Sequence, residues 1–192
     1  MVVNAKGSAY PTEIAAMLFD MEELILERVN TLIPHELTDK MKQMVVHEGD
    51  LTYFERYFES ISTSTTRLNR SYAQFNQMTS KTDLILAHGA TKIKGLVTQI
   101  PELKIGNVPW LCTQYEFQWG DRIRKLDDIA NKYGVDLTGR YSALGDCNIL
   151  FNCILNYPGI RELLTKLAHR KKRKPKPYFH GPKRMKVSVV AT

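Results

Sequence analysis

Cysteine is scarce in this chain, and its few copies are not spaced for chemistry. The 192 residues include three cysteines, Cys112, Cys147 and Cys153, and no two of them form a CxxC pair. An odd number at these spacings excludes a complete disulfide framework and a zinc site with four cysteine ligands. We therefore expect three reduced side chains that are buried in a hydrophobic core, because free cysteine is among the most buried residue types.

Long apolar runs are also missing. No stretch of about 18 apolar residues occurs, which excludes a spanning helix of the usual kind. The first residues, MVVNAKGSAYPTE, lack the charged and then apolar pattern of a secretory signal. The sequence therefore predicts a soluble intracellular protein that has no membrane partner.

The common catalytic signatures are absent as well. The chain has no GxxxxGK[ST], GxGxxG, HExxH or GxSxG motif, so nucleotide hydrolysis, dinucleotide redox chemistry, zinc proteolysis and serine hydrolysis lose their usual support. Five histidines are scattered without a carboxylate at ligand spacing: His35, His47, His88, His169 and His180. We expect these to be solvated or hydrogen-bonded side chains, and we expect no metal ion and no cofactor.

Acidic residues are missing from the last 30 positions. Residues 1–162 hold 17 Lys and Arg against all 20 Asp and Glu, a net charge of −3, whereas residues 163–192 hold 10 basic residues and no acid, a net charge of +10. This division predicts one globular domain over residues 1–162 and a basic tail over residues 163–192. A polyanion would be attracted to the tail.

The tail combines basic and aromatic side chains. Basic groups neutralise phosphates and aromatic rings stack on unpaired bases, the pairing typical of proteins that bind single strands. We expect nucleic-acid contacts from Arg170, Lys171, Lys172, Arg173, Lys174, Lys176, Tyr178, Phe179, Lys183, Arg184 and Lys186. Prolines 175, 177 and 182 favour an extended backbone. Two alternatives remain open: the KKRK cluster at 171–174 is typical of nuclear import signals, and the apolar residues 187–190 could dock on the sheet edge of a protein partner.

The hydrophobic pattern predicts strands first and an alternation of strands and helices later. Apolar runs and period-two alternation predict strands over residues 1–3, 13–19, 24–33, 84–87 and 108–112. Spacings of three and four predict helices over residues 37–45, 51–58, 68–78, 95–100, 126–133 and 143–157. The polar residues 60–66 read as a loop. This order favours an antiparallel meander followed by strand–helix units, hence an α/β domain with a mixed sheet.

Three segments resemble a known family. The opening strand and its successor, then LILAHGATKIK at 84–94, then a segment with KLDDIANKYGV at 125–135 and YSALGD at 141–146 follow one another as in the DEDDh 3′-5′ exonucleases. These enzymes belong to the RNase H-like superfamily and include proofreading exonucleases. The match runs from about residue 1 to residue 157 and is strongest over residues 125–150. It implies an RNase H-like fold, a mixed sheet flanked by helices.

The residues at the catalytic positions of the family differ from those that the chemistry needs. The resemblance places the first two acids at Asn4 and Lys6, the third at Ile93, the general-base histidine at Tyr141 and the last acid at Asp146. Two-metal phosphodiester hydrolysis needs several carboxylates around a pair of divalent ions about 4 Å apart. The four acid positions here sum to zero charge, and a tyrosine does not replace histidine as a base near neutral pH.

The sequence therefore predicts a degenerate exonuclease-like protein, not an enzyme, that binds single-stranded DNA or RNA without cleaving it. We also expect Lys6 to lie within salt-bridge reach of Asp146. One alternative is a structural or adaptor subunit that uses the fold and the tail for contacts with a protein partner or RNA. Another is an active nuclease that draws its acids from Glu13, Asp20 or Asp128.

Overall fold

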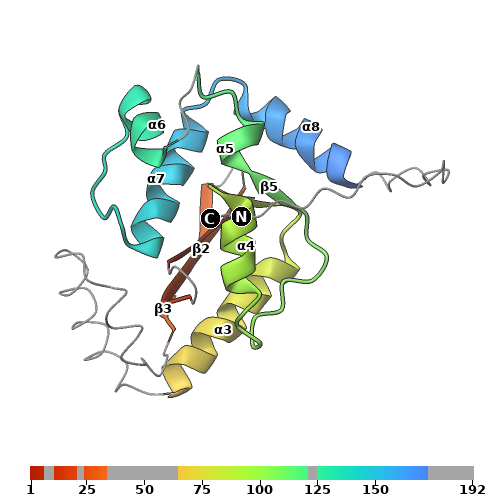
Figure 1. Cartoon of the computed structure of the whole chain (residues 1–192). Helices are drawn as coiled ribbons and strands as arrows, with labels where there is room; N and C mark the ends of the chain where they lie inside the picture. Colours follow the sequence, from red (N-terminus) through yellow and green to blue (C-terminus); the bar gives the residue numbers. More distant parts are fainter. Residues whose placement is uncertain (7–10, 21–23, 34–64, 121–124, 173–192) are drawn as a thin grey trace, which may run out of the picture.

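A computed structural model describes residues 1–6, 11–20, 24–33, 65–120 and 125–172 of the chain (Figure 1). The described part is a mixed α/β structure in which one five-stranded sheet is flanked by helices. Among these residues no helix is long and apolar enough to cross a membrane.

The sheet combines an antiparallel half and a parallel half. Its strands are β1 (Val2–Lys6), β2 (Glu13–Asp20), β3 (Leu24–Leu32), β4 (Ile85–Ala87) and β5 (Trp110–Cys112), in the spatial order β3-β2-β1-β4-β5. The first three strands form the predicted antiparallel meander, while β4 and β5 run parallel to β1. All five predicted strands are confirmed, with small shifts at their ends.

Six helices are described: α3 (Thr65–Ser80), α4 (Ala90–Val97), α5 (Thr113–Glu116), α6 (Leu126–Lys132), α7 (Ala143–Leu155) and α8 (Ile160–Lys172). The helices predicted around α3, α6 and α7 are confirmed. The helix predicted over 95–100 instead begins at Ala90, because the left-handed Gly89 (φ 77°) turns the chain directly out of β4. The helices predicted over 37–45 and 51–58 lie outside the described residues, and the last two residues of the predicted loop at 60–66 already belong to α3.

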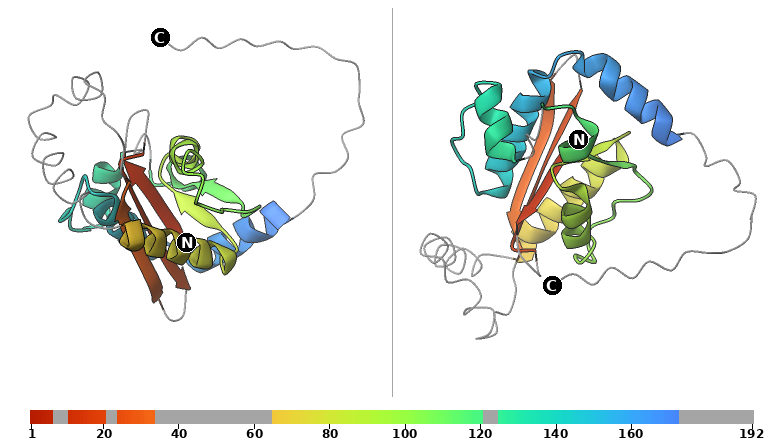
Figure 2. Two further views of the ribbon diagram at one scale, coloured as in Figure 1. Left: turned by 90° about the horizontal axis from the view of Figure 1, so that it is seen from below. Right: turned by 45° about the horizontal axis from the view of Figure 1, so that its top comes forward.

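Helices lie on both faces of the sheet (Figure 2). Two apolar clusters, one on each face, fill the space between the helices and the sheet. Alternation along β2 sends Ala15 and Met17 into the cluster formed with α6, α7 and α8, and sends Ile14 and Ala16 into the cluster formed with α3 and α4. The short β4 is buried on both faces, as its continuous apolar run predicts.

Two of the three cysteines are buried between the sheet and the helices, and the third is not. Cys147 and Cys153 of α7 are buried, as predicted, whereas Cys112 at the end of β5 is only half-buried. Burial raises the pKa of the Cys153 thiol to about 11.

Helix α8 was not predicted, and it crosses the boundary expected at residues 162 and 163. Ile160, Leu163, Leu164 and Leu167 recur at helical spacing, and Leu167 is buried in the cluster beside α7. Lysine and arginine are good helix formers, so the first basic residues continue the helix instead of ending it. The start of the basic segment therefore belongs to the folded body.

The loop before α7 packs tightly on the first turn of that helix. Gly139 (φ 81°) and Tyr141 (φ 75°) both have left-handed backbone, which glycine tolerates and tyrosine rarely adopts. The Ser142 hydroxyl accepts a hydrogen bond from the Gly145 amide at 3.0 Å and caps the helix. A Cβ at Gly145 would lie 1.7 Å from the Gly139 carbonyl oxygen, so only glycine fits there.

Replacing a glycine inside a helix by alanine usually stabilises a protein. The close contact between Gly145 and the Gly139 carbonyl should reverse that effect. We predict that Gly145→Ala lowers the free energy of unfolding by about 2 kcal/mol, because the loop must move away from α7. The matched control is Gly95→Ala in α4, where a Cβ meets nothing within 4 Å. That change should stabilise the protein by about 0.5 to 1 kcal/mol in urea denaturation. A stabilising Gly145→Ala would contradict the packing described here.

Candidate functional site

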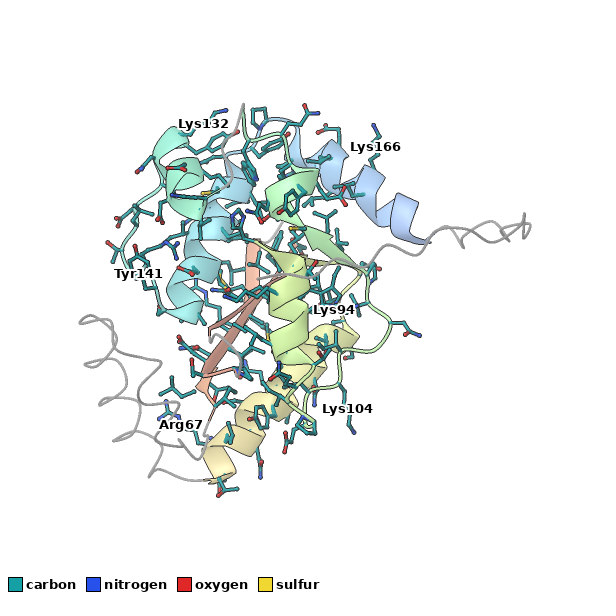
Figure 3. The ribbon with its side chains drawn as sticks, in the orientation of Figure 1. Arg67, Lys94, Lys104, Lys132, Tyr141 and Lys166 are labelled. Atoms are coloured by element: carbon teal, nitrogen blue, oxygen red, sulfur yellow. The ribbon has the colours of Figure 1, made fainter. Side chains whose placement is uncertain are left out.

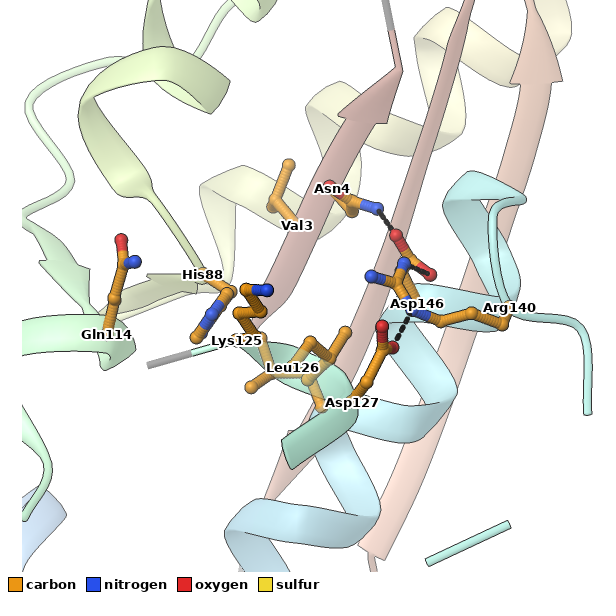
Figure 4. Close-up of a pocket in the computed structure, with 10 residues that line it drawn as sticks. Val3, Asn4, His88, Gln114, Lys125, Leu126, Asp127, Arg140 and Asp146 are labelled. Carbon is orange, nitrogen blue, oxygen red and sulfur yellow. Dashed lines mark hydrogen bonds and ion pairs between the residues drawn. The ribbon is translucent and has the colours of Figure 1, made fainter. Parts of the chain in front are cut away.

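A pocket of about 320 Å³ lies where β1, the end of β4, α6 and the start of α7 meet (Figure 4). We call it the Asp146 pocket. Its lining residues are Val3, Asn4, His88, Gln114, Lys125, Leu126, Asp127, Arg140, Asp146 and Leu150. They come from segments that are far apart in the sequence, so the fold alone creates this site.

Asn4 and Asp146 join β1 to α7 inside the pocket. Val2 of β1 faces the cluster around α7, and the period-two alternation of the strand puts Asn4 on the same face. The cap at Ser142 fixes the start of α7 and so places Asp146 in its first turn. The Asn4 Nδ2 atom donates to the Asp146 Oδ2 atom at 3.1 Å, across 142 positions of sequence.

Arg140 lies between two carboxylates. Its Nη1 atom is 2.6 Å from Asp146 Oδ1, and its Nε atom donates to Asp127 Oδ1. Figure 4 draws the guanidinium between the two acids, one from α6 and one from α7. The Asp146 side chain is 8% exposed and that of Arg140 is 21% exposed, so both ends of this ion pair are largely shielded from water.

Further contacts fix the pair. The Tyr141 amide donates to Asp146 Oδ1 at 3.2 Å, and the guanidinium carbon of Arg140 lies 4.7 Å from the centre of the Tyr141 ring. Burial alone would lower the pKa of the Arg140 guanidinium, but its hydrogen bonds to Asp127 and Asp146 outweigh that effect and raise the pKa. Arg140 is therefore a permanent cation in this pocket.

The opposite wall is polar and carries one exposed cation. His88 follows β4 and its Nδ1 atom lies 3.2 Å from the Thr113 hydroxyl, a hydrogen-bonded state of the kind predicted for the histidines. Gln114 is half-buried and Lys125 is exposed. With His88 neutral, Arg140 and Lys125 balance Asp127 and Asp146, so the pocket has no formal net charge.

The pocket does not fit the pair of metal ions that the family resemblance implies. Both Asp146 oxygens accept hydrogen bonds, one from Arg140 and the Tyr141 amide and the other from Asn4. A metal ligand must offer those lone pairs to the ion instead. Within the described part of the chain, no group of three or more His, Cys, Asp and Glu side chains could hold a metal ion.

The structure brings together some of the residues singled out in the sequence and separates others. Asn4 and Asp146 line the pocket. Tyr141 reaches Asp146 through its backbone amide, and the residue, labelled in Figure 3, is 71% exposed. Ile93 is 5% exposed in the cluster on the opposite face of the sheet, so it does not belong to this pocket. The Lys6 side chain lies outside the described residues, and so does its expected pairing with Asp146.

The side chains of all the predicted tail contacts lie outside the described residues. Arg170, Lys171 and Lys172 lie in α8, but their side chains fall outside the described residues. The others, Arg173, Lys174, Lys176, Tyr178, Phe179, Lys183, Arg184 and Lys186, lie in a segment outside the described residues.

Sequence reasoning missed several residues of the pocket. Asp127 lies in the first turn of α6 and is half-buried against Arg140. Arg140, Lys125 and Gln114 were not singled out at all. The neighbouring Thr-Gly-Arg turn is visible in the sequence, but no local pattern indicates that its arginine points toward two distant acids. Glu13, considered as a spare catalytic acid, instead accepts a hydrogen bond from the Ala143 amide at 2.7 Å.

Comparison with known proteins assigns the chain to no family. No family model matches the chain, and no curated protein matches its sequence. The functional argument therefore depends on the pocket and on the distribution of charge.

The contact between Asn4 and Asp146 gives a pH-dependent prediction. Asn4→Asp replaces a donor by a second carboxylate beside Asp146 and should destabilise the fold by about 2 kcal/mol at pH 7. Repulsion raises the pKa of one carboxyl in the folded state, so the cost should shrink as pH falls toward 4 and that group takes up a proton.

Urea denaturation at several pH values would measure this difference. The control Asn4→Ala removes only the hydrogen bond, so its cost of about 1 kcal/mol should change little with pH. An Asn4→Asp cost that is the same at pH 7 and pH 4.5 would contradict the contact.

Proposed function

We propose that this chain is a catalytically degenerate, exonuclease-like protein that binds single-stranded nucleic acid without cleaving it. The supporting observation is the Asp146 pocket, because the resemblance to DEDDh exonucleases assigns the nuclease centre to β1 and the start of α7. In this chain an amide and a guanidinium, from Asn4 and Arg140, engage the one acid that remains from the family pattern.

The architecture supports an RNase H-like assignment. That fold implies a mixed sheet flanked by helices, and the described residues form such a sheet with helices on both faces. The last acid of the family pattern, Asp146, hydrogen-bonds the residue at the first acid position, Asn4, although the two are 142 positions apart. Chance agreement of short motifs would not require these two positions to meet.

The charge distribution supports the binding half of the proposal. Residues 173–192 hold six Lys and Arg and no acid, while residues 1–172 hold the other 21 basic residues against 20 acids, a net charge of +1. Residues 1–172, with their neutral pocket, therefore attract phosphate weakly. Most of the electrostatic attraction comes from residues 173–192, with Tyr178 and Phe179 available to stack on bases.

The first prediction of this proposal is the absence of cleavage. The purified full chain, incubated with labelled single- and double-stranded DNA and RNA and with Mg²⁺ or Mn²⁺, should release no mononucleotides. The reason is that the pocket offers guanidinium and amide groups where the two ions need carboxylates. Metal-dependent release that disappears in Asp146→Ala would refute the proposal and favour an active nuclease.

The second prediction concerns the tail. A chain shortened to residues 1–172 keeps α8 and its buried Leu167, so it should stay folded, and it should lose most of its affinity for single strands. If six basic residues contact phosphates, the logarithm of the affinity of the full chain should fall against the logarithm of salt concentration with a slope of about −4.

A matched variant separates stacking from charge. Tyr178→Ala with Phe179→Ala should weaken binding about tenfold or more but leave the salt slope unchanged, because stacking releases no counterions. Fluorescence anisotropy with labelled oligonucleotides would measure both quantities. If the shortened chain binds as tightly as the full chain, or if neither binds, the tail serves another role and the adaptor interpretation is favoured.

A further inference from the structure

Positive charge is unevenly distributed over the first 172 residues, although its sum there is small. Residues 65–108, which run from α3 through α4 to the loop before β5, hold six Lys and Arg against two acids, a net charge of +4. The other residues between 1 and 172 hold 15 Lys and Arg against 18 acids, a net charge of −3. One part of the molecule therefore attracts anions although the average over residues 1–172 is close to zero.

Five basic side chains are exposed on α3, α4 and the loop after α4. We call them the basic face: Arg67, Arg70, Lys92, Lys94 and Lys104. Figure 3 labels three of them, one on each of these elements. The sixth basic residue, Lys81, forms an ion pair with Glu27 at 2.7 Å. Among the described residues no acid pairs with Arg70 or with the three lysines of the face, so their charges are open to a partner.

The loop after α4 joins the two helices into one surface. The Asn76 side chain of α3 donates to the Glu102 carbonyl at 2.9 Å and accepts from the Lys104 amide at 2.7 Å. The Thr79 hydroxyl of α3 lies 3.2 Å from the Lys104 carbonyl oxygen. Helices α3 and α4 also share one apolar cluster on the same face of the sheet. The basic face therefore lies on the opposite side of the sheet from α6, α7 and α8.

The helix ends add to the positive potential on this side. The N-terminus of a helix carries a partial positive charge, which an acid in the first turn offsets. On the other side of the sheet, α6, α7 and α8 each have such an acid. Neither α3 nor α4 has one. Instead, Arg67 and Arg70 lie in the first two turns of α3 and Lys92 lies in the first turn of α4, so the positive helix ends are reinforced.

The face has charge but no exposed ring or large apolar side chain. The exposed large hydrophobic residues of the described part of the chain are Leu26, Tyr115 and Tyr141, and none of them belongs to α3, α4 or the loop after α4. The face therefore offers nothing to stack on unpaired bases and nothing to insert into a lipid bilayer. Its chemistry suits a partner that presents regularly spaced anions.

We propose that the basic face binds the phosphate backbone of a nucleic-acid duplex. A duplex hides its bases and presents one charge per about 1.7 Å of its axis. Helix α3 has 16 residues and so is about 24 Å long, a length over which a duplex presents about 14 charges. This inference goes beyond the proposed function, because it assigns a second ligand to another surface and requires neither the tail nor a degenerate nuclease centre.

The test compares duplex and single-strand binding by the full chain. The face variant carries Arg70→Gln, Lys92→Gln, Lys94→Gln and Lys104→Gln, which remove charge but keep polar side chains. Fluorescence anisotropy would measure its affinity for a labelled DNA duplex of about 20 base pairs at several salt concentrations. The slope of log affinity against log salt should become shallower by about 3 to 4, at about 0.9 per lost phosphate contact. Affinity for single strands should change less than about twofold, because the tail provides it.

A matched pair of variants separates the basic face from basic charge in general. Lys92→Gln with Lys94→Gln removes two charges of α4 and should reduce the duplex slope by about 2. Arg161→Gln with Lys166→Gln removes two exposed charges of α8, on the other side of the sheet, and should leave duplex binding unchanged. Circular dichroism should show the same helix content in all variants, because every substituted side chain is exposed. If the face variant does not fold, the two pairs still give the comparison.

Four results would overturn the proposal. These are a full chain that does not bind the duplex, face substitutions that leave its affinity and slope unchanged, an α8 pair that loses as much as the α4 pair, and an equal loss of affinity for single strands. The outcomes are distinct from those of the tail experiment. A full chain that binds the duplex through the basic face but binds no single strands would refute the proposed function and support this inference.

Discussion

The contact between Arg140 and Asp146 holds the Asp146 pocket of this protein in one arrangement. Asp146 is 8% exposed, and its charge is matched by a guanidinium, a backbone amide and the Asn4 side chain. Through these partners it connects β1, the loop before α7 and α7 itself, and Arg140 extends the connection to Asp127 of α6. Loss of the arginine would leave a buried carboxylate without its countercharge, which is far more costly than loss of an exposed ion pair.

Because the charges of the pocket are already paired, we assign the binding of single strands to a second region of the chain. The Asp146 pocket combines equal positive and negative charge, and its acids are occupied by internal donors. The excess positive charge lies in residues 173–192, whose six basic residues face no acid in their own segment. In our account the electrostatic attraction to single strands therefore resides at the end of the chain.

Local patterns in the sequence were sufficient for most of the sheet. The alternation in β2 and the unbroken apolar run in β4 reflect how each strand is buried, so both could be read directly. The pocket depends on contacts between residues more than a hundred positions apart, as between Asn4 and Asp146, and family resemblance was the only guide to that pair. The direction of Arg140 is set by the left-handed backbone of its neighbours, which has no local signature. The burial of Ile93 does have one, because Ile93 recurs at helical spacing with Leu96 and Val97 on the buried face of α4.

A double-mutant cycle between Arg140 and Asp146 tests the central claim most directly. The free energies of unfolding of the full chain, Arg140→Ala, Asp146→Ala and the double variant would be measured in urea at pH 7. Our account predicts a coupling of about 2 kcal/mol or more, with the double variant more stable than the sum of the single losses implies, because each single change leaves a shielded charge without one of its countercharges. A coupling near zero would show that the two side chains do not depend on each other and would contradict the account.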